Sequence, residues 1–145
     1  MTMLAQSTGT EAQIIDRLRG DNALALTLVA VDHGRVVGYV AASQAQIGAH
    51  DRWGLIGPLA VLPSRHGQGI GSTLMAETIR RLRATFHGAV LVGDPRYYGR
   101  FGFKAYPGLG VGAIPLEFVQ ALPFDVAEPR GEVIHHPAFG LKQQG

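Results

Sequence analysis

The chain has 145 residues, of which 46% are hydrophobic and 17% charged, a composition typical of one folded domain. It contains no cysteine, which excludes disulfides, thiolate metal sites and a cysteine nucleophile and fits a reducing cytoplasm. The formal net charge is +2 with dispersed arginines, which argues against nucleic acid, and no apolar run reaches the roughly 18 residues of a membrane-spanning helix. We therefore expect a single cytoplasmic domain over residues 1–145 that binds neither nucleic acid nor membrane.

The first half of the chain predicts a short helix followed by antiparallel strands. Apolar residues at helical spacing indicate an amphipathic helix over residues 11–19. Two β-rich runs, residues 24–31 and 36–42, flank residues 32–35, whose Asp and Gly are typical of a tight hairpin. A further strand over residues 53–62 is apolar on both faces, which predicts a place in the middle of a sheet.

The second half predicts one βαβ unit followed by a tail. Apolar residues from Ile70 to Phe86 recur in steps of three and four, which predicts a long helix that ends at Gly88. A buried strand is expected next, over residues 89–92, and in the Gly- and Pro-rich tail the only expected strand covers residues 132–136. Together these elements predict an α+β fold, with a mixed sheet and helices on its faces.

The turn between the central strand and the long helix is the clearest candidate site. It reads His66-Gly67-Gln68-Gly69-Ile70-Gly71. A helix start has unpaired amides and the positive end of the helix dipole, and glycines let an anion approach the backbone. Ser72 adds a hydroxyl donor, and Arg65 adds a cation beside the turn. The turn therefore predicts a site for a phosphate group.

Two common phosphate-binding motifs fit this turn less well. A Walker loop needs a lysine before its Ser or Thr, but Gly71 precedes Ser72. A dinucleotide fingerprint needs a third glycine at the position that Ser72 occupies. A nucleotide-binding domain is therefore disfavoured, and the pyrophosphate of coenzyme A fits better.

Two motifs at matching separation resemble the GNAT superfamily of N-acetyltransferases, and in particular its YhbS-like bacterial branch. Leu59-Ala60-Val61-Leu62-Pro63 with the Gly-rich turn is similar to the superfamily's acetyl-CoA motif, Gln/Arg-x-x-Gly-x-Gly/Ala, with His66 at its first position. Residues 93–103 are similar to its Tyr-x-x-x-Gly-Phe segment, and residues 132–139 resemble the ending of that branch. The resemblance spans residues 11–140.

The resemblance implies transfer of an acetyl group from acetyl-CoA to a primary amine of a small molecule or a protein, and it suggests a homodimer. The segment Leu59-Ala60-Val61 would pair with the pantetheine arm through the backbone of Leu59 and Val61, where the strand bulges. Amides from Gly67 through Ser72 would hold the pyrophosphate. The implied sheet is mixed and mostly antiparallel, and no counterpart of the superfamily's opening strand is evident before residue 11.

The resemblance also assigns a catalytic and cofactor-binding role to Tyr98, which matches the tyrosine that lies near the coenzyme sulfur. A phenol with a pKa of about 10 is protonated at neutral pH and can supply a proton or a hydrogen bond to a departing thiolate. Tyr97, its neighbour, is expected to pack against the sheet.

No general base is apparent on the central strand. His50, Asp51, Glu117 and the pair His135-His136 are candidates, and each fits a surface or turn position better. Adjacent histidines on a strand point to opposite faces, so no metal site is expected. The alternative to an enzyme is therefore a CoA-binding regulatory or interaction module without catalytic activity.

Overall fold

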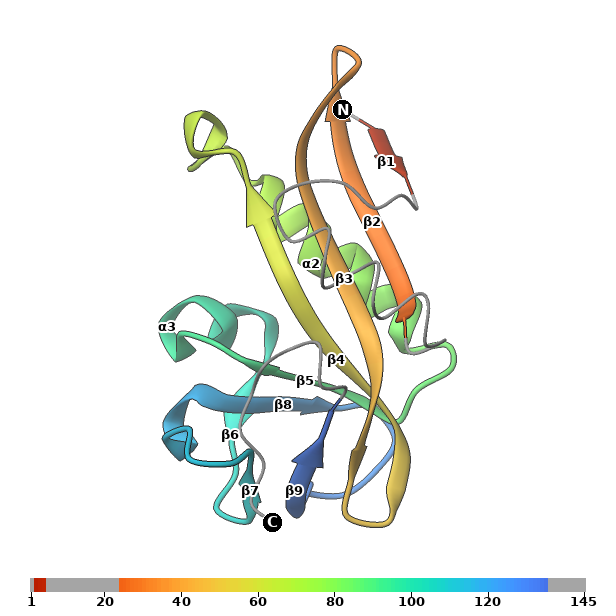
Figure 1. Cartoon of the computed structure of the whole chain (residues 1–145), viewed down its shortest axis with the longest axis vertical. Helices are drawn as coiled ribbons and strands as arrows, with labels where there is room; N and C mark the ends of the chain where they lie inside the picture. The colour runs from red at the N-terminus through yellow and green to blue at the C-terminus, as the bar shows by residue number, and fades with distance from the viewer. Residues whose placement is uncertain (1, 5–23, 136–145) are drawn as a thin grey trace.

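The computed structural model describes residues 2–4 and 24–135 (Figure 1). The strands are β1 (Thr2–Leu4), β2 (Leu24–Asp32), β3 (Arg35–Ile47), β4 (His50–Val61), β5 (Gly88–Val92), β6 (Lys104–Ala105), β7 (Leu109–Gly110), β8 (Val119–Pro123) and β9 (Gly131–Ile134). The helical segments are η1 (Pro63–Arg65), α2 (Ile70–Leu82), α3 (Pro95–Tyr98), η2 (Gly99–Phe101) and η3 (Leu116–Phe118). The helix predicted over residues 11–19 lies outside the described residues.

Within the described residues the strands form a mixed sheet in the order β1-β2-β3-β4-β5-β8-β6. Strand β9 pairs with the end of β3 and with β7. Neighbouring strands are antiparallel, except that β4 runs parallel to β5 and β7 parallel to β9. Helix α2 covers one face of β2, β3 and β4, as Figure 1 shows. The predicted α+β fold with a mostly antiparallel sheet is confirmed.

A short opening strand is present, contrary to the expectation that this strand is missing. The three residues of β1 pair antiparallel with Val29–Val31 of β2. Such a short edge segment shows no periodicity of its own, since its hydrogen bonds come from the strand beside it.

The β2–β3 hairpin forms where the sequence predicts it. Asp32 pairs with Arg35, and His33 and Gly34 between them have φ of 51° and 74°. Positive φ at both central residues is what a type I′ turn requires. Strand β3 continues beyond the predicted end to Ile47, because after Ser43 its exposed glutamines alternate with buried residues.

Strand β4 leaves its neighbour β5 after a short stretch. The parallel pairing covers Trp53–Leu55 of β4 and Gly88–Val90 of β5, and beyond it the two strands diverge (Figure 1). On its other side β4 pairs with β3, where Val40 faces Leu59 and Ala42 faces Ile56, so β4 carries one extra residue, a bulge. The upper half of β4 thus bulges and has a free edge toward β5.

Helix α2 buries one face and keeps the other in solvent. Ile70, Leu74, Met75, Ile79 and Leu82 are buried against the sheet, as the apolar spacing predicts. The helix ends at Leu82 rather than near Gly88, because its last amides bond three residues back, from Ala84 to Arg81 and from Thr85 to Leu82.

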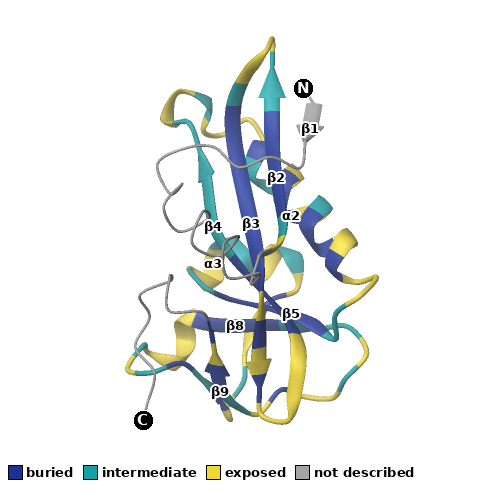
Figure 2. Ribbon diagram, turned by 45° about the vertical axis from the view of Figure 1, so that its right-hand side comes forward, coloured by how far each residue is buried: buried dark blue, intermediate teal, exposed yellow. Residues whose placement is uncertain are grey.

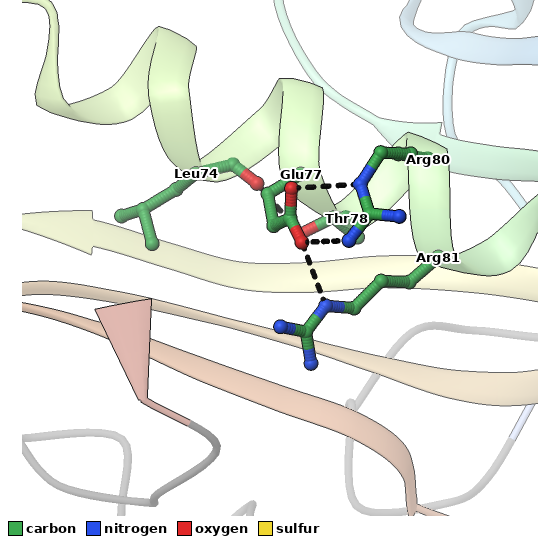
Figure 3. A network of polar contacts seen from close by, with 5 residues as sticks. All are labelled: Leu74, Glu77, Thr78, Arg80 and Arg81. Carbon is green, nitrogen blue, oxygen red and sulfur yellow. Dashed lines mark hydrogen bonds and ion pairs between the residues drawn. The ribbon is translucent and has the colours of Figure 1, made fainter. Parts of the chain in front are cut away.

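The exposed face of α2 carries an ion-pair cluster of Glu77, Arg80 and Arg81 (Figure 3). Arg80 Nε and Arg81 Nε donate to the Glu77 carboxylate over 3.0 and 2.9 Å. The arginines lower the pKa of Glu77 from 4.5 to about 2. The ionised carboxylate therefore favours the folded state, although solvent screening keeps this effect small.

Glu77→Gln is expected to flatten the acid side of the stability profile. A lowered folded-state pKa contributes stability that is fully present above pH about 4.5 and is lost as the pH falls toward about 2. Urea denaturation across this pH range measures the slope. Glu117→Gln, which changes an exposed glutamate of η3, is the control. An identical acid slope in Glu77→Gln and the parent would contradict the expectation.

Strand β8 was not predicted, because residues 132–136 were the only strand expected in the tail. Residues Val119–Pro123 nevertheless lie inside the sheet, between β5 and β6. Buried Gln120 and terminal Pro123 break the apolar pattern, and the strand forms because two neighbours supply its hydrogen bonds. The predicted tail strand is observed as β9, over Gly131–Ile134.

Figure 2 shows where burial ends. The middle of β3, β5 and β8 is buried, whereas β4 changes from buried to intermediate as it approaches the Gly-rich turn. In the described part of the chain, no helix combines the length and apolar character needed to cross a membrane.

Candidate functional site

The Gly-rich turn forms an open cradle at the start of α2. Gly67 and Gly69 have φ of +79° and +80°, and a Cβ added at either position would meet no atom within 4 Å. Gly69 is the N-cap of α2, and no side chain accepts a capping hydrogen bond from the first amides of the helix. Amides of the first helical turn have no partner within a helix. The backbone here therefore offers donors to a group that approaches from outside.

This cradle forms one wall of a cavity of about 430 Å³. The other walls come from the free edge of β4 and from the segment after β5. The cavity is lined by Leu59, Val61, Arg65, His66, Gly67, Gly69, Ile70, Gly71, Ser72, Tyr97 and Arg100.

Three of the predicted site residues lie outside this lining. Ala60 packs on the other face of the sheet, against the cluster that contains Tyr39. Gln68 accepts a hydrogen bond from Arg65 Nε through its Oε1 atom, over 2.8 Å. Tyr98 lies beside the cavity and packs against the core instead.

Arg65 is already paired with a carboxylate. Its Nη2 atom donates to Asp32 Oδ2 over 2.6 Å, and this hydrogen bond lowers the pKa of Asp32 below its ordinary value. Arg65 thereby ties the Gly-rich turn to the β2–β3 hairpin. Its charge is largely offset before any phosphate arrives.

His66 holds the turn against the end of β4. Its Nε2 atom lies 3.0 Å from the carbonyl oxygen of Val61. A carbonyl only accepts, so the ring donates from Nε2. The resemblance assigns the backbone of Leu59 and Val61 to the pantetheine arm, but the Val61 carbonyl already accepts this hydrogen bond. Leu59 is therefore better placed than Val61 to pair with the arm.

Tyr97 and Arg100 line the cavity, although neither was predicted to do so. The phenol oxygen of Tyr97 lies over Gly71, where an added Cβ would come within 2.8 Å of it. The Arg100 guanidinium stacks on the Tyr97 ring, 4.7 Å from its centroid. The expectation that Tyr97 packs against the sheet is wrong. Tyr97 and Arg100 are three residues apart in consecutive helical segments, and this spacing is the sequence signal that would have predicted their contact.

Tyr98 is held in place by its neighbours. Its ring lies on the backbone of Gly93, where an added Cβ would come within 2.3 Å of Cε2, and it meets the Phe103 ring edge-on at 6.4 Å. Burial raises the pKa of Tyr98 above 10.0. Its phenol therefore stays protonated at neutral pH, and its catalytic role stays a prediction.

The candidate general bases lie away from this cavity. His50 and Asp51 begin β4, at the end opposite the Gly-rich turn. Glu117 is exposed in η3, and His135 is buried just after β9. His136 lies outside the described residues. None of the four described candidates lines the cavity. The described residues also contain no group of three or more His, Asp or Glu side chains placed to hold a metal ion.

A comparison with models of protein families identifies the family of this chain. Residues 23–105, more than half of the chain, match the sequence model of the acetyltransferase (GNAT) domain. The chain belongs to the GNAT acetyltransferase family. The predicted resemblance is thereby confirmed, and the cavity lies at the GNAT motif on which that resemblance rests.

Individual GNAT relatives point to the same branch. The chain is 41% identical over 97 residues to the uncharacterized N-acetyltransferase YhbS of Escherichia coli (strain K12). That alignment covers 65% of this chain and only 58% of the relative's length.

Two solved GNAT structures are similar over most of both chains. A GNAT family acetyltransferase from Brucella melitensis, in complex with acetyl-CoA, has a TM-score of 0.76 at 43% identity and covers 94% of this chain and 82% of its own. YhbS from Escherichia coli, in complex with CoA, has a TM-score of 0.82 at 31% identity. This match covers 97% of the present chain and 84% of the YhbS chain.

Proposed function

We propose that this chain, as a single domain, transfers the acetyl group of acetyl-CoA to a primary amine of a small molecule or protein. The observation that carries the proposal is the uncapped start of α2 beside the free, bulged edge of β4, both opening on one cavity. The two solved structures described above are complexes with acetyl-CoA and CoA, which supports the same cofactor here. A cytoplasmic location and a homodimer stay predictions.

The described residues fit the parts of this cofactor in order. The amides from Gly67 through Ser72 would hold the pyrophosphate, since Gly67 and Gly69 leave the approach open. The backbone of Leu59, next to the bulge, would pair with the pantetheine arm as an added strand does. In this proposed arrangement the thioester would lie in the gap where β4 and β5 diverge.

The chemistry of this gap then depends on Tyr98. Acetyl-CoA supplies a thioester whose carbon–sulfur bond breaks as the amine nitrogen forms its bond to the acetyl carbon. Tyr98 follows β5 across the gap from the cradle, and as a protonated phenol it donates its proton to the leaving sulfur. The amine nitrogen loses one proton as the amide forms, and this proton passes through water and restores the Tyr98 phenol. An amine that binds in its neutral form needs no earlier deprotonation, whereas an ammonium first loses a further proton to water.

A second candidate function is a CoA-binding module without catalysis. It is favoured by the position of His50, Asp51, Glu117 and His135 away from the cavity. A thiol-release assay with acetyl-CoA and a broad amine panel decides between the two. Thiol release is expected with at least one amine; tight binding of acetyl-CoA without thiol release would favour the module. Thermal stabilisation by NAD or ATP but not by CoA would contradict both.

Arg100→Ala is expected to weaken CoA binding by about tenfold, with a smaller loss at high salt. Arg65 is paired with Asp32, so Arg100 is the lining arginine whose charge we assign to a phosphate. Calorimetry at two salt concentrations measures the loss. Arg96→Ala is the control, because Arg96 belongs to the same segment but pairs with Asp94 and lies outside the cavity lining. Equal affinity of the two variants would contradict this assignment.

A further inference from the structure

Gln120 is a buried polar residue near the start of β8. Its exposed fraction is 0%, and it faces Leu91 of β5 on one side and Ala105 of β6 on the other. A carboxamide in such a place is unfavourable unless its polar atoms are hydrogen-bonded. Its Nε2 atom donates to the carbonyl oxygen of Gly93 over 2.9 Å, while its Oε1 atom is buried without a hydrogen-bond partner.

Both backbone polar groups of Gly93 are hydrogen-bonded to the segment formed by the end of η3 and the start of β8. The Gly93 amide donates to the carbonyl of Phe118 over 2.9 Å, and the Gly93 carbonyl accepts from Gln120. Gly93 lies between the end of β5 and Asp94, the N-cap of α3. Gln120 therefore fixes the point at which the chain leaves the sheet and enters the segment that carries Tyr98.

The same glycine is the surface on which the Tyr98 ring rests. An added Cβ at Gly93 would come within 2.3 Å of Tyr98 Cε2 and 2.8 Å of Cδ2, so the ring lies in van der Waals contact with the backbone. The Tyr97 ring meets it edge-on at 4.9 Å. A displacement of Gly93 would thus move the phenol directly, since nothing lies between them.

We propose that Gln120 is a positioning residue for Tyr98, acting through the Gly93 carbonyl. This rests on the proposed acetyl transfer, in which Tyr98 donates a proton to sulfur. A leucine of similar size would not bury an unpartnered Oε1 atom, but it could not donate to the Gly93 carbonyl. The contribution of Gln120 is the hydrogen bond that sets the start of α3, and hence the place of the phenol.

Gln120→Leu is expected to lower kcat by about tenfold and to change the affinity for CoA much less, because Tyr98 rests directly on Gly93 whereas Tyr97 lies over Gly71. In a Tyr98→Phe background the same change is expected to cause no further loss, since the group it positions is gone. Gln44→Leu is the matched control: Gln44 also donates its amide to a carbonyl, that of Asp51, but at the far end of β4. Its kcat is expected to equal that of the parent.

Gln120→Glu separates positioning from packing. Burial raises the pKa of a carboxyl group, and only its protonated form can donate to the Gly93 carbonyl. Activity is therefore expected to recover toward the parent as the pH is lowered, which the leucine variant does not show. If the leucine variant does not fold, the glutamate variant still tests the role of Gln120.

An activity-independent measurement keeps this proposal distinct from the proposed function. The ionisation of Tyr98 is followed by ultraviolet absorbance as the pH is raised. The absorbance of the matching Tyr98→Phe variant is subtracted, which leaves the signal of Tyr98 alone. In Gln120→Leu the ionisation is expected at lower pH than in the parent, because a displaced phenol loses burial. A parent without thiol release would overturn the proposed function alone. Equal kcat losses in both backgrounds, or an unshifted Tyr98 ionisation, would overturn the role of Gln120.

Discussion

Gly69→Val is expected to weaken CoA binding by at least about 100-fold. This is the effect of losing two charge-assisted hydrogen bonds between backbone amides and the pyrophosphate. Gly69 is the N-cap of α2, and the space where its Cβ would lie is open to the cavity. A branched side chain there would occupy the approach of the pyrophosphate to the amides. Its left-handed φ of +80° also disfavours a β-branched residue, which would shift the amides themselves.

A matched variant separates blocked binding from lost stability. Gly34 in the β2–β3 hairpin has φ of +74° and likewise no atom within 4 Å of an added Cβ. Gly34→Val therefore introduces a comparable backbone strain without entering the cavity. Urea denaturation is expected to show similar destabilisation of both variants, and calorimetry a loss of CoA affinity in Gly69→Val alone. Equal loss of affinity in both variants would show that strain, not the cradle, is responsible.

Tyr98→Phe is expected to lower kcat by about 100-fold with the affinity for CoA nearly unchanged. The substitution removes the proton donor but keeps the ring that rests on Gly93 and Phe103. Because burial raises the pKa of Tyr98, the parent is expected to lose activity only above pH 10.0, where the phenol ionises. The variant is expected to lack this alkaline decline. Steady-state kinetics across the pH range measures both effects.

The adjacent tyrosine provides the comparison for this variant. The Tyr97 hydroxyl lies over Gly71 in the cavity, so Tyr97→Phe is expected to weaken CoA binding and to leave kcat near that of the parent. The opposite result, with kcat lost in Tyr97→Phe and kept in Tyr98→Phe, would transfer the donor role to Tyr97.

Local patterns in the sequence predicted most of the elements around the site. The apolar steps from Ile70 predicted α2, the Asp–Gly turn predicted the β2–β3 hairpin, and the alternating glycines predicted an open helix start. Each of these depends on neighbours within one or two turns of the chain. Strand β8 was missed because its hydrogen bonds come from β5 and β6, which the local pattern does not contain.

The lining of the cavity was predicted only in part, for the same reason. Arg65 was expected as a cation for phosphate, but the fold brings Asp32 of the hairpin to within 2.6 Å of it. The sequence does not predict a place for Arg100 in the site, and in the structure Arg100 lines the cavity and stacks on Tyr97. Such pairings follow from the order of the strands, which places residues that are distant in the sequence side by side.

The amino-acid order alone specified the Gly-rich turn between β4 and α2, and with it a helix start open to an anion. Backbone conformation and helical periodicity are properties of short segments, so they can be derived without the rest of the chain. Three features depend on the folded sheet. They are the free edge of β4, the position of Tyr97 in the cavity lining, and the hydrogen bond from Gln120 to Gly93. These features depend on where β4 and β5 separate and on β8 pairing beside them, which are contacts between distant segments.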